Sequence, residues 1–245
     1  MTTTTWILSD VHLRWDRPER AERLARFVER RDPSRDRLVI GGDLCDFWFA
    51  SRQSHTEPPD QPPRCLGLRS LAGFVASGGR LSLIAGNHDQ WLNHYYQRVL
   101  NTSFTPEPWV ETIGGRVVHL YHGHRIGRPP FWKVAMESRR FLDAFRVLPE
   151  PFAVGLSQRL DRNNDRTRLE DDRRVLARYQ AYVQTHARQA HLILFGHIHT
   201  PVFHPARDDV FPPRPSWAVL GGWQTQSSWL RLDDDPDHPP CLVVE

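Results

Sequence analysis

The sequence of 245 residues lacks, or has little of, several features that mark particular classes of protein. It has 3 cysteines, which lie far apart. They provide neither the paired framework of a disulfide-rich domain nor the clustered thiolates of a zinc knuckle, so we expect reduced thiols in a cytoplasmic protein. No apolar run approaches the roughly 20 residues that span a bilayer. Residues 1–10 have no basic segment ahead of their apolar run, which argues against a cleaved signal peptide.

Lysine is almost absent, because Lys133 is the only one among 32 basic side chains. Nearly every cation is therefore an arginine, whose planar guanidinium suits forked contacts with phosphate. Residues 125–178 hold 13 basic and 8 acidic side chains, a net +5, so the rest of the chain carries −2 of the total of +3. Such a segment would attract an anionic substrate or an anionic membrane surface. A solvated helix face is the equally weighted alternative.

Short apolar runs alternate with helix-like segments in the first half of the chain. The runs at 6–8, 38–40 and 81–84 predict buried strands, and 18–30, 66–77 and 91–100 have helical spacing. This alternation predicts an α/β sheet layered with helices. In the second half, Gly114-Gly115 predicts a hairpin turn before a strand at 117–121. Further short strands are predicted at 192–195, 202–203, 217–220, 229–232 and 242–244.

About 70 residues between His122 and Leu192 contain no strand pattern. Apolar side chains recur there at helical spacing over 131–148, 152–160 and 175–183. We therefore expect a single domain, 1–245, with a helical cap insertion at 125–190 that covers the strand ends, since a structured insertion of this length is usually functional. The proline-rich stretch 51–64 is expected to be a surface loop.

Five short strings occur in series, each near the end of an apolar run. Singly, each is more typical of a surface turn or of a hydrogen-bonded structural histidine. In series they predict a site, because layered α/β folds gather such side chains at the strand ends. The strings are Asp10-x-His12, Gly42-Asp43-Leu44-Cys45-Asp46, Gly86-Asn87-His88-Asp89, His122-Gly123 and Gly196-His197-Ile198-His199.

The side chains of these strings suit a pair of divalent ions, which would activate water and hold phosphoryl oxygens during hydrolysis. We expect Asp43 to bridge the ions with one oxygen facing each. Residues two apart on an extended segment point the same way, so both imidazoles of the last string can contribute. Ligands without thiolate favour Mn, the first choice, with Fe and Zn as alternatives. The expected ligands are Asp10, His12 and His199 for one ion, and Asn87, His122 and His197 for the other.

The two candidate catalytic residues are His88 and Asp46. His88 follows a predicted ligand and is expected to protonate the leaving oxygen. Asp46 is expected to orient that imidazole and keep it protonated. The remaining singled-out side chains have no defined catalytic role and are expected to be structural; they are His94, His119, His124, Cys45, Trp48, Trp223 and Trp229.

Together the five strings are the motif set of the calcineurin-like metallophosphoesterases, and the chain resembles that superfamily over nearly its whole length. The resemblance implies a four-layer α/β/β/α sandwich with a dimetal centre at one edge, and it supports the ligand assignment. Within the superfamily the chain is most similar to UDP-2,3-diacylglucosamine hydrolases, peripheral-membrane pyrophosphatases of lipid A synthesis. The similarity lies in residues 42–48, in the insertion after Gly123, and in Leu220-Gly221-Gly222-Trp223 with the following strand.

The chain also departs from those hydrolases. They typically have Arg at the position of His88 and Asp at the position of His124. Candidate substrate contacts in the cap are Arg162, Asn163, Asn164 and Arg166.

The resemblance implies a dimetal phosphoesterase that cleaves a pyrophosphate or phosphodiester bond, with UDP-2,3-diacylglucosamine, giving lipid X and UMP, as the first candidate substrate. A nucleotide or nucleic acid is the alternative, because attraction of phosphate to the +5 segment is not specific. A non-catalytic scaffold is disfavoured, since all seven ligand positions and His88 are present. A lipid substrate also implies weak contact of the cap with the inner face of the membrane.

Overall fold

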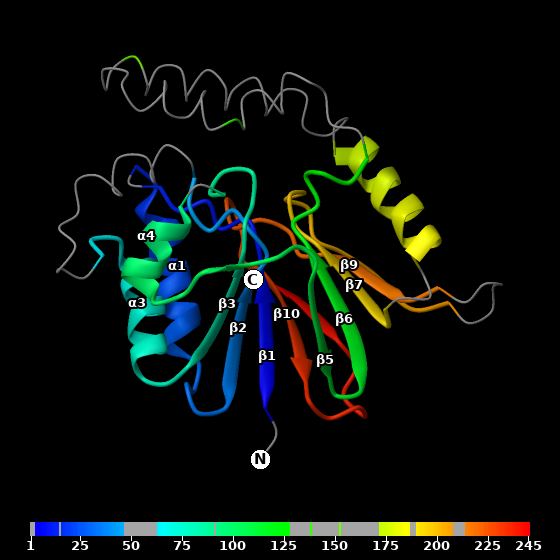
Figure 1. Ribbon diagram of the computed structural model, residues 1–245, viewed down its shortest axis with the longest axis horizontal. Helices are drawn as coiled ribbons and strands as arrows, with labels where there is room; N and C mark the ends of the chain where they lie inside the picture. The colour runs from blue at the N-terminus through cyan, green and yellow to red at the C-terminus, as the bar shows by residue number, and fades with distance from the viewer. Residues whose placement is uncertain are drawn as a thin grey trace.

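The computed structural model describes residues 3–14, 16–46, 63–90, 92–127, 138, 152, 172–186, 190–207 and 214–245. Two mixed β-sheets form its centre, with helices outside them (Figure 1). In chain order the elements are β1 (Thr4–Leu8), α1 (Pro18–Glu29), β2 (Asp36–Ile40), α3 (Leu66–Ala76), β3 (Arg80–Ile84), α4 (Asn93–Leu100), β4 (Phe104–Thr105), β5 (Trp109–Ile113), β6 (Arg116–Tyr121), a helix at 172–186, β7 (Leu192–Phe195), β8 (Val202–His204), β9 (Ser216–Val219), β10 (Ser228–Asp233) and β11 (Cys241–Val244).

The first sheet has six strands in the order β11-β10-β1-β2-β3-β4. Strands β1 to β4 run parallel, and β10 and β11 extend the sheet in antiparallel fashion beyond β1. The central strand β1 therefore pairs with the first half of the chain on one side and with its end on the other. Thr4 lies opposite Asp233, 229 positions later, and their side chains share a hydrogen bond of 2.7 Å.

The second sheet has five strands in the order β5-β6-β7-β9-β8. Strands β6, β7 and β9 are parallel, and the antiparallel strands β5 and β8 form the two edges. The turn between β5 and β6 contains Gly114 and Gly115, both at positive φ, as the sequence predicts for this hairpin.

Alternating side chains on the central strands divide the interior into three apolar cores. Val39 of β2 and Leu194 of β7 point into the core between the two sheets. Leu38 and Ile40, one residue to either side of Val39, pack instead against α1, α3 and α4. Phe195, next to Leu194, packs against the helix at 172–186. Because successive side chains of a strand point to opposite faces, each buried strand needs apolar residues throughout.

The resulting order of layers is helices α1, α3 and α4, then the first sheet, then the second sheet, then the helix at 172–186 (Figure 1). The expected four-layer α/β/β/α sandwich is thus confirmed. The short strands predicted from apolar runs are all present. The sequence did not predict β4, which has two residues, or β5, whose Val110 side chain is 52% exposed, because neither forms a continuous apolar run.

Several predictions fall on residues outside the described part of the chain. These are most of the loop at 51–64, Trp48, the cap apart from its first residues and the helix at 172–186, and the four candidate substrate contacts Arg162, Asn163, Asn164 and Arg166. Among the described helices, none has the length and apolar character to cross a membrane. Cys45, Trp223 and Trp229 pack in the first core as expected.

Candidate metal centre

The predicted ligands lie on the loops that follow β1, β2, β3, β6 and β7. These loops bend sharply, because several of the ligand residues themselves have positive φ, a conformation uncommon outside glycine. Among the described residues, five that are not glycine have positive φ, and four of these five are predicted ligands. Backbone strain is therefore concentrated at this site. The four are Asp10 (φ 54°), His12 (φ 49°), Asp43 (φ 53°) and His197 (φ 66°), and Asn101, which caps α4, is the fifth.

The first group of ligand atoms comes from Asp10, His12 and His199. The Nε2 atoms of the two imidazoles lie 3.1 Å apart. Asp10 Oδ1 lies 3.7 Å from Nε2 of His12 and 3.6 Å from Nε2 of His199. All three ligand atoms fall within 4.8 Å of one another, which is close enough to surround one cation.

The carboxylate of Asp10 is held by one of its oxygens and presents the other. Oδ2 accepts hydrogen bonds from the Ser9 hydroxyl at 2.5 Å and from the main-chain N–H of His197 at 2.8 Å. Oδ1 is buried and has no hydrogen-bond partner. A buried oxygen without a partner costs free energy, and a cation between this oxygen and the two imidazoles would remove that cost. The residues present therefore fit a metal ion.

The second group comes from Asp43, Asn87, His122 and His197. Nε2 of His122 lies 3.3 Å from Asp43 Oδ2 and 3.1 Å from Asn87 Oδ1. The ligand atoms of Asp43, His122 and His197 all lie within 4.8 Å of one another. The opposite ring nitrogen of His122, Nδ1, donates to the main-chain carbonyl of Gly41 at 2.9 Å. This bond fixes the tautomer that leaves Nε2 available to a metal.

Asp43 joins the two groups, although in a different way from the one expected. Its Oδ2 faces both His122 and His12, at 3.3 Å and 3.8 Å from their Nε2 atoms. Its Oδ1 instead accepts the main-chain N–H of His88 at 2.7 Å. The sequence led us to expect one oxygen for each ion, whereas the structure turns a single oxygen toward both groups. The nearby imidazoles hold the pKa of Asp43 well below its usual range, outweighing burial, which acts in the opposite direction.

His88 stands at the edge of this cluster, beside the Asp46 carboxylate. Its Nδ1 lies 3.5 Å from Asp46 Oδ1, and 27% of its side chain is exposed. Burial disfavours the imidazolium, but the charge of Asp43 and the contact with Asp46 outweigh burial and raise the pKa of His88 to about 9. Its ring also lies within 4.8 Å of the ligand atoms of His12 and Asp43, so geometry alone allows it to act as a ligand. Its assignment as the acid stays a prediction.

Asp46 has a second set of neighbours that the sequence did not reveal. Its Oδ2 lies 3.5 Å from Arg14 Nη1 and 4.0 Å from Nδ1 of His12. The carboxylate therefore contacts a predicted ligand and the predicted acid at once. Burial would raise the pKa of Asp46, but its contact with His88 outweighs burial and holds this pKa well below its usual range. Asp46 stays ionised at neutral pH and can orient both rings.

The glycines of the strings let the backbone pass close to the ligands. A Cβ on Gly86 would collide with the carboxylate of Asp43, and one on Gly196 would collide with the Ser9 hydroxyl. A Cβ on Gly42, which also has positive φ, would press on the ring of His122. Any larger residue at these positions must displace a ligand or its support.

Asp89 supports the site in a way that the sequence analysis missed. Its buried carboxylate accepts the main-chain N–H of Gly86 at 2.8 Å, that of Leu44 at 2.9 Å and the Tyr96 hydroxyl at 3.0 Å. It thereby ties the loop after β3, which carries Asn87, to the loop after β2. Burial and the charge of Asp43 raise the pKa of Asp89 to about 6. Its place at the end of the third string was the signal that could have revealed it.

His124, for which no role was predicted, lies against the second group. Its ring centroid is 5.2 Å from that of His122 and 6.3 Å from that of His197, and neither of its ring nitrogens has a hydrogen-bond partner. Burial, together with the charge of His122, lowers the pKa of His124 to about 2, so its imidazole is neutral. His119 lies on β6, away from the strand ends.

Comparisons with known proteins agree with this geometry. Residues 3–201 match the family model described as calcineurin-like phosphoesterase. The UDP-2,3-diacylglucosamine hydrolase of Aeromonas salmonicida is 27% identical over 238 residues, covering 93% of this chain and 89% of that protein. The enzyme of the same name from Stenotrophomonas maltophilia strain R551-3 is 28% identical over 245 residues, covering 94% of this chain and 95% of that protein.

Among solved structures, a predicted phosphoesterase from Streptococcus pneumoniae aligns with 100% of this chain and 99% of its own. Its TM-score is 0.42 at 13% identity, too low to compare details of the fold. The family assignment rests on the match over residues 3–201, which contains every predicted ligand. The chain belongs to the calcineurin-like phosphoesterase family, the metal-dependent phosphoester hydrolases that its five strings predicted.

Proposed function

We propose that the chain hydrolyses the pyrophosphate bond of UDP-2,3-diacylglucosamine, releasing UMP and lipid X, with two divalent cations bound at the metal centre. The observation that carries this proposal is a centre in which Asp43 joins two groups of ligand atoms. It is supported by relatives named for that substrate, which match over nearly their full lengths. The proposed ligands are Asp10, His12, Asp43, Asn87, His122, His197 and His199.

The donor set supports manganese as the metal, with iron and zinc as alternatives. Carboxylate, amide and imidazole donors without any thiolate suit these ions better than magnesium or calcium. Two such ions, when bound, supply a Lewis acid for the phosphoryl oxygens and lower the pKa of a bound water. The protein supplies the positions of the donors and the means to move a proton.

In this proposal the proton for the leaving oxygen comes from His88. The main-chain N–H of this residue is anchored on Asp43, and its ring is oriented by Asp46 and partly open to solvent. A ring so placed can reach a leaving group bound above the centre and donate to it. Asp46, ionised and held near Arg14, restores the imidazolium after each turnover by favouring its charged form.

The substrate is tested with purified protein that has been depleted of metal and then supplied with Mn²⁺. UDP-2,3-diacylglucosamine and bis(p-nitrophenyl) phosphate are compared, with release of UMP and of nitrophenol as the measurements. We expect UMP release that depends on the metal and is abolished by a chelator. Turnover of the simple diester without any UMP release would exclude the lipid substrate and leave the phosphoesterase chemistry intact. Cleavage of RNA or nucleotides at a higher kcat/KM would favour the alternative substrate class.

The role of His88 is tested with His88→Ala, measured on aryl diesters whose leaving groups differ in pKa. An acid matters most when the leaving group is poor, so the loss of kcat should grow with the pKa of the leaving group. The metal content of the variant should stay that of the parent protein. An equal loss on all leaving groups together with missing metal would identify His88 as a ligand instead.

The remaining part of the proposal concerns the cap at 125–190. We propose that Arg162, Asn163, Asn164 and Arg166 contact the substrate there, and that the cap gives weak binding to anionic membranes. Support comes from the +5 charge of residues 125–178. Co-sedimentation with vesicles containing phosphatidylglycerol checks it, and the expectation is binding that weakens as salt rises. Absence of any binding at low salt would remove the membrane part of the proposal.

A further inference from the structure

One further loop reaches the metal centre, although none of the five strings lies on it. Strands β6, β7 and β9 run parallel, and the predicted ligands of the second sheet follow β6 and β7. The loop at 220–227, which joins β9 to β10, leaves the third of these parallel strands at the same edge. Because the carboxyl ends of parallel strands meet at one edge of a sheet, this loop is placed beside the ligands that follow β7.

Main-chain hydrogen bonds hold this loop against the first group of ligands. The N–H of Gly222 donates to the carbonyl of His199 at 3.0 Å, and the N–H of Trp223 donates to the carbonyl of Asp10 at 3.0 Å. Gly222 packs so closely that a Cβ there would lie 2.9 Å from atoms of the His199 side chain. The loop is therefore fixed to both of the ligand loops that supply the first group, those after β1 and β7.

Two further contacts fix the main chain around Gln224, the residue that follows Trp223. A guanidinium nitrogen of Arg23, on α1, donates to the carbonyls of both Trp223 and Gln224. The indole N–H of the buried Trp223 donates to the carbonyl of Ser228 at 2.9 Å. Because its main chain is held by α1 and by the packed indole, the side chain of Gln224 starts from a defined position next to the first group.

The side-chain amide of Gln224 lies among the ligand atoms of the first group. Its nitrogen is 3.2 Å from Nε2 of His199. The other two ligand atoms of this group, Nε2 of His12 and Oδ1 of Asp10, lie 3.1 Å and 3.6 Å from the same His199 nitrogen. The amide is thus as close to this nitrogen as the predicted ligands are, and it belongs to the same cluster of donor atoms.

A cation at the first group decides which end of this amide can face the group. Without a cation, the N–H of the amide can donate to the lone pair on Nε2 of His199. A cation needs that lone pair and repels the positive end of an N–H, whereas it attracts a carbonyl oxygen. Half a turn of the amide exchanges its nitrogen for its oxygen, because the two atoms are nearly alike in size and position. The oxygen of Gln224 then joins the donors of the first group.

The second group already contains an amide in a matching place. Oδ1 of Asn87 lies 3.1 Å from Nε2 of His122. The amide of Gln224 stands in the same relation to Nε2 of His199, at 3.2 Å. Neutral oxygen donors of this kind suit manganese. We propose that Gln224 is a further ligand of the first ion, through its side-chain oxygen Oε1. This inference rests on the dimetal centre of the proposed function, but it is independent of the substrate.

The experiment measures metal binding by Gln224→Leu, which removes both polar atoms of the amide with little change in size. Gln184→Leu, which makes the same change at an exposed position of the helix at 172–186, is the matched control. The full-length proteins are freed of metal and titrated with Mn²⁺ in competition with a chelator, which resolves the two affinities. One of the two affinities should be at least about tenfold weaker in Gln224→Leu, since loss of a mere supporting contact already costs roughly 10–100-fold. The control should match the parent.

A second variant, Gln224→Glu, separates a ligand from a residue that only packs. Its carboxylate offers an oxygen at nearly the same place and adds a negative charge, so both Mn²⁺ affinities should equal or exceed those of the parent. A residue with a packing role alone would gain nothing from this change. Circular dichroism of the metal-free proteins confirms that each variant is folded, and the comparison of Gln224→Glu with the parent remains decisive if Gln224→Leu does not fold.

The sign of the change in affinity is the critical result. Unchanged affinities in Gln224→Leu would overturn the inference, and tighter binding would show that the amide only competes with the cation for the lone pair of His199. A weaker affinity in Gln224→Glu than in the parent would also overturn it. In each of these cases a parent that binds two ions leaves the proposed dimetal centre intact. A parent that binds no ion at the first group would overturn both proposals together.

Discussion

The two sheets contribute to the metal centre in different ways. Among the ligands on the five strings, loops of the first sheet supply every oxygen donor, from Asp10, Asp43 and Asn87, whereas the second sheet supplies imidazoles alone. One ligand of each set is oriented by the main chain of the opposite sheet. The N–H of His197, after β7, holds the carboxylate of Asp10, and the carbonyl of Gly41, after β2, orients His122. Displacing one sheet from the other would therefore remove a main-chain hydrogen bond from Asp10 and one from His122.

The strongest way to break this arrangement is to remove the residue shared by both groups. Asp43→Asn keeps the shape and the tolerance for positive φ but loses the charge that faces both groups of imidazoles. We expect both metals to be lost and activity to fall by far more than the roughly 10–100-fold that follows loss of an outer hydrogen bond. Elemental analysis and kcat measure the two effects. Asp235→Asn, an exposed acid in a turn, is the control, and a variant that retained one metal would contradict the bridging role.

A second test concerns the close approach of the loop after β3 to the loop after β2. Gly86→Ala would place a methyl group against the carboxylate and main chain of Asp43, so we expect a loss of about 1–3 kcal/mol in the free energy of unfolding, and weaker metal binding. Gly73→Ala in α3 is the matched control, because its Cβ meets no atom within 4 Å. This control should gain about 0.4–1 kcal/mol. Urea titration followed by circular dichroism measures both, and equal effects would refute the steric argument.

A third test should weaken metal binding at the first group of ligands more than at the second. Ser9→Ala removes a hydrogen bond to Asp10 Oδ2 and leaves the bond from His197 in place. Affinity at the first group should fall by about 10–100-fold while that at the second group is nearly unchanged. Competition with a metal chelator during titration resolves the two sites. Ser34→Ala, on an exposed turn, controls for loss of a hydroxyl.

The smallest expected effect is the release of a single proton from His122 when the metal binds. Burial disfavours protonation of His122, but the Asp43 carboxylate outweighs burial and raises the pKa of His122 to about 10 in the metal-free protein. Its imidazolium therefore stabilises the metal-free fold fully below the usual value near 6.5, and this contribution is lost as pH rises through about 10. A metal needs the neutral ring, so binding at pH 7.5 should release a proton.

Calorimetry in two buffers of different ionisation enthalpy counts the protons released on metal binding. His122→Ala should release about one fewer than the parent. Release that is the same in both proteins would show that another group supplies the proton.

Much of the fold and of the site was predictable from the sequence, for a physical reason. Strands buried on both faces have continuous apolar runs, so 38–40 and 192–195 were recognisable, and residues directly after such runs fall at one edge of the sheets. What escaped prediction depends on contacts between distant loops. Which oxygen of Asp43 faces both groups is set by the N–H of His88, and the role of Asp89 is set by donors from two loops.

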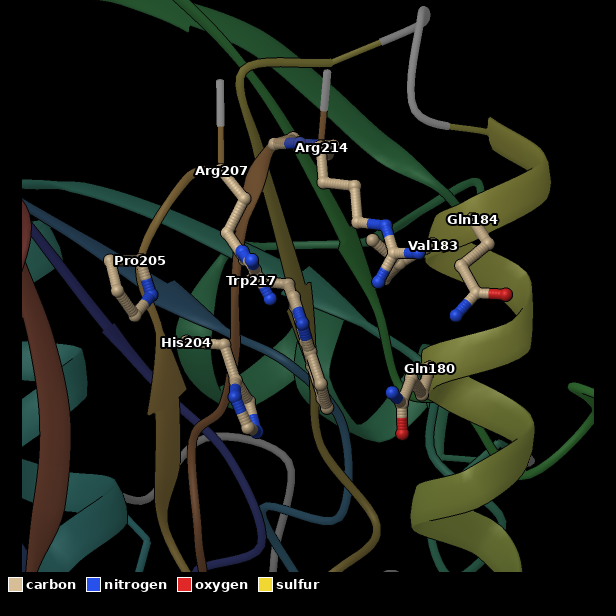
Figure 2. A pocket seen from close by; sticks show the side chains of 9 residues that line it. Gln180, Val183, Gln184, His204, Pro205, Arg207, Arg214 and Trp217 are labelled. Carbon is tan, nitrogen blue, oxygen red and sulfur yellow. The ribbon is translucent and has the colours of Figure 1, made fainter. Parts of the chain in front are cut away.

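The facing of Arg207 and Arg214, which line a pocket beside the helix at 172–186 (Figure 2), escaped prediction for the same reason. Arg207 and Arg214 are ordinary surface residues in the sequence, and only the register of β8 and β9 brings them opposite each other. The positive φ of His12 is equally invisible, because few residues other than glycine adopt it and the sequence does not mark which of them do.

The pairing of β1 with β10 has a consequence for how the protein is made. Strand β1 and its ligand loop are synthesised early relative to two of their partners. One neighbouring strand, β10, and the main-chain N–H of Trp223, which donates to the carbonyl of Asp10, follow more than 200 residues later. Contacts of such long range are slow to form and arise late. The surroundings of Asp10 and His12 therefore stay incomplete in the nascent chain until β10 has been synthesised. Metal loading at the first group should consequently follow the synthesis of β10, and a protein truncated before β10 should bind no metal at this group.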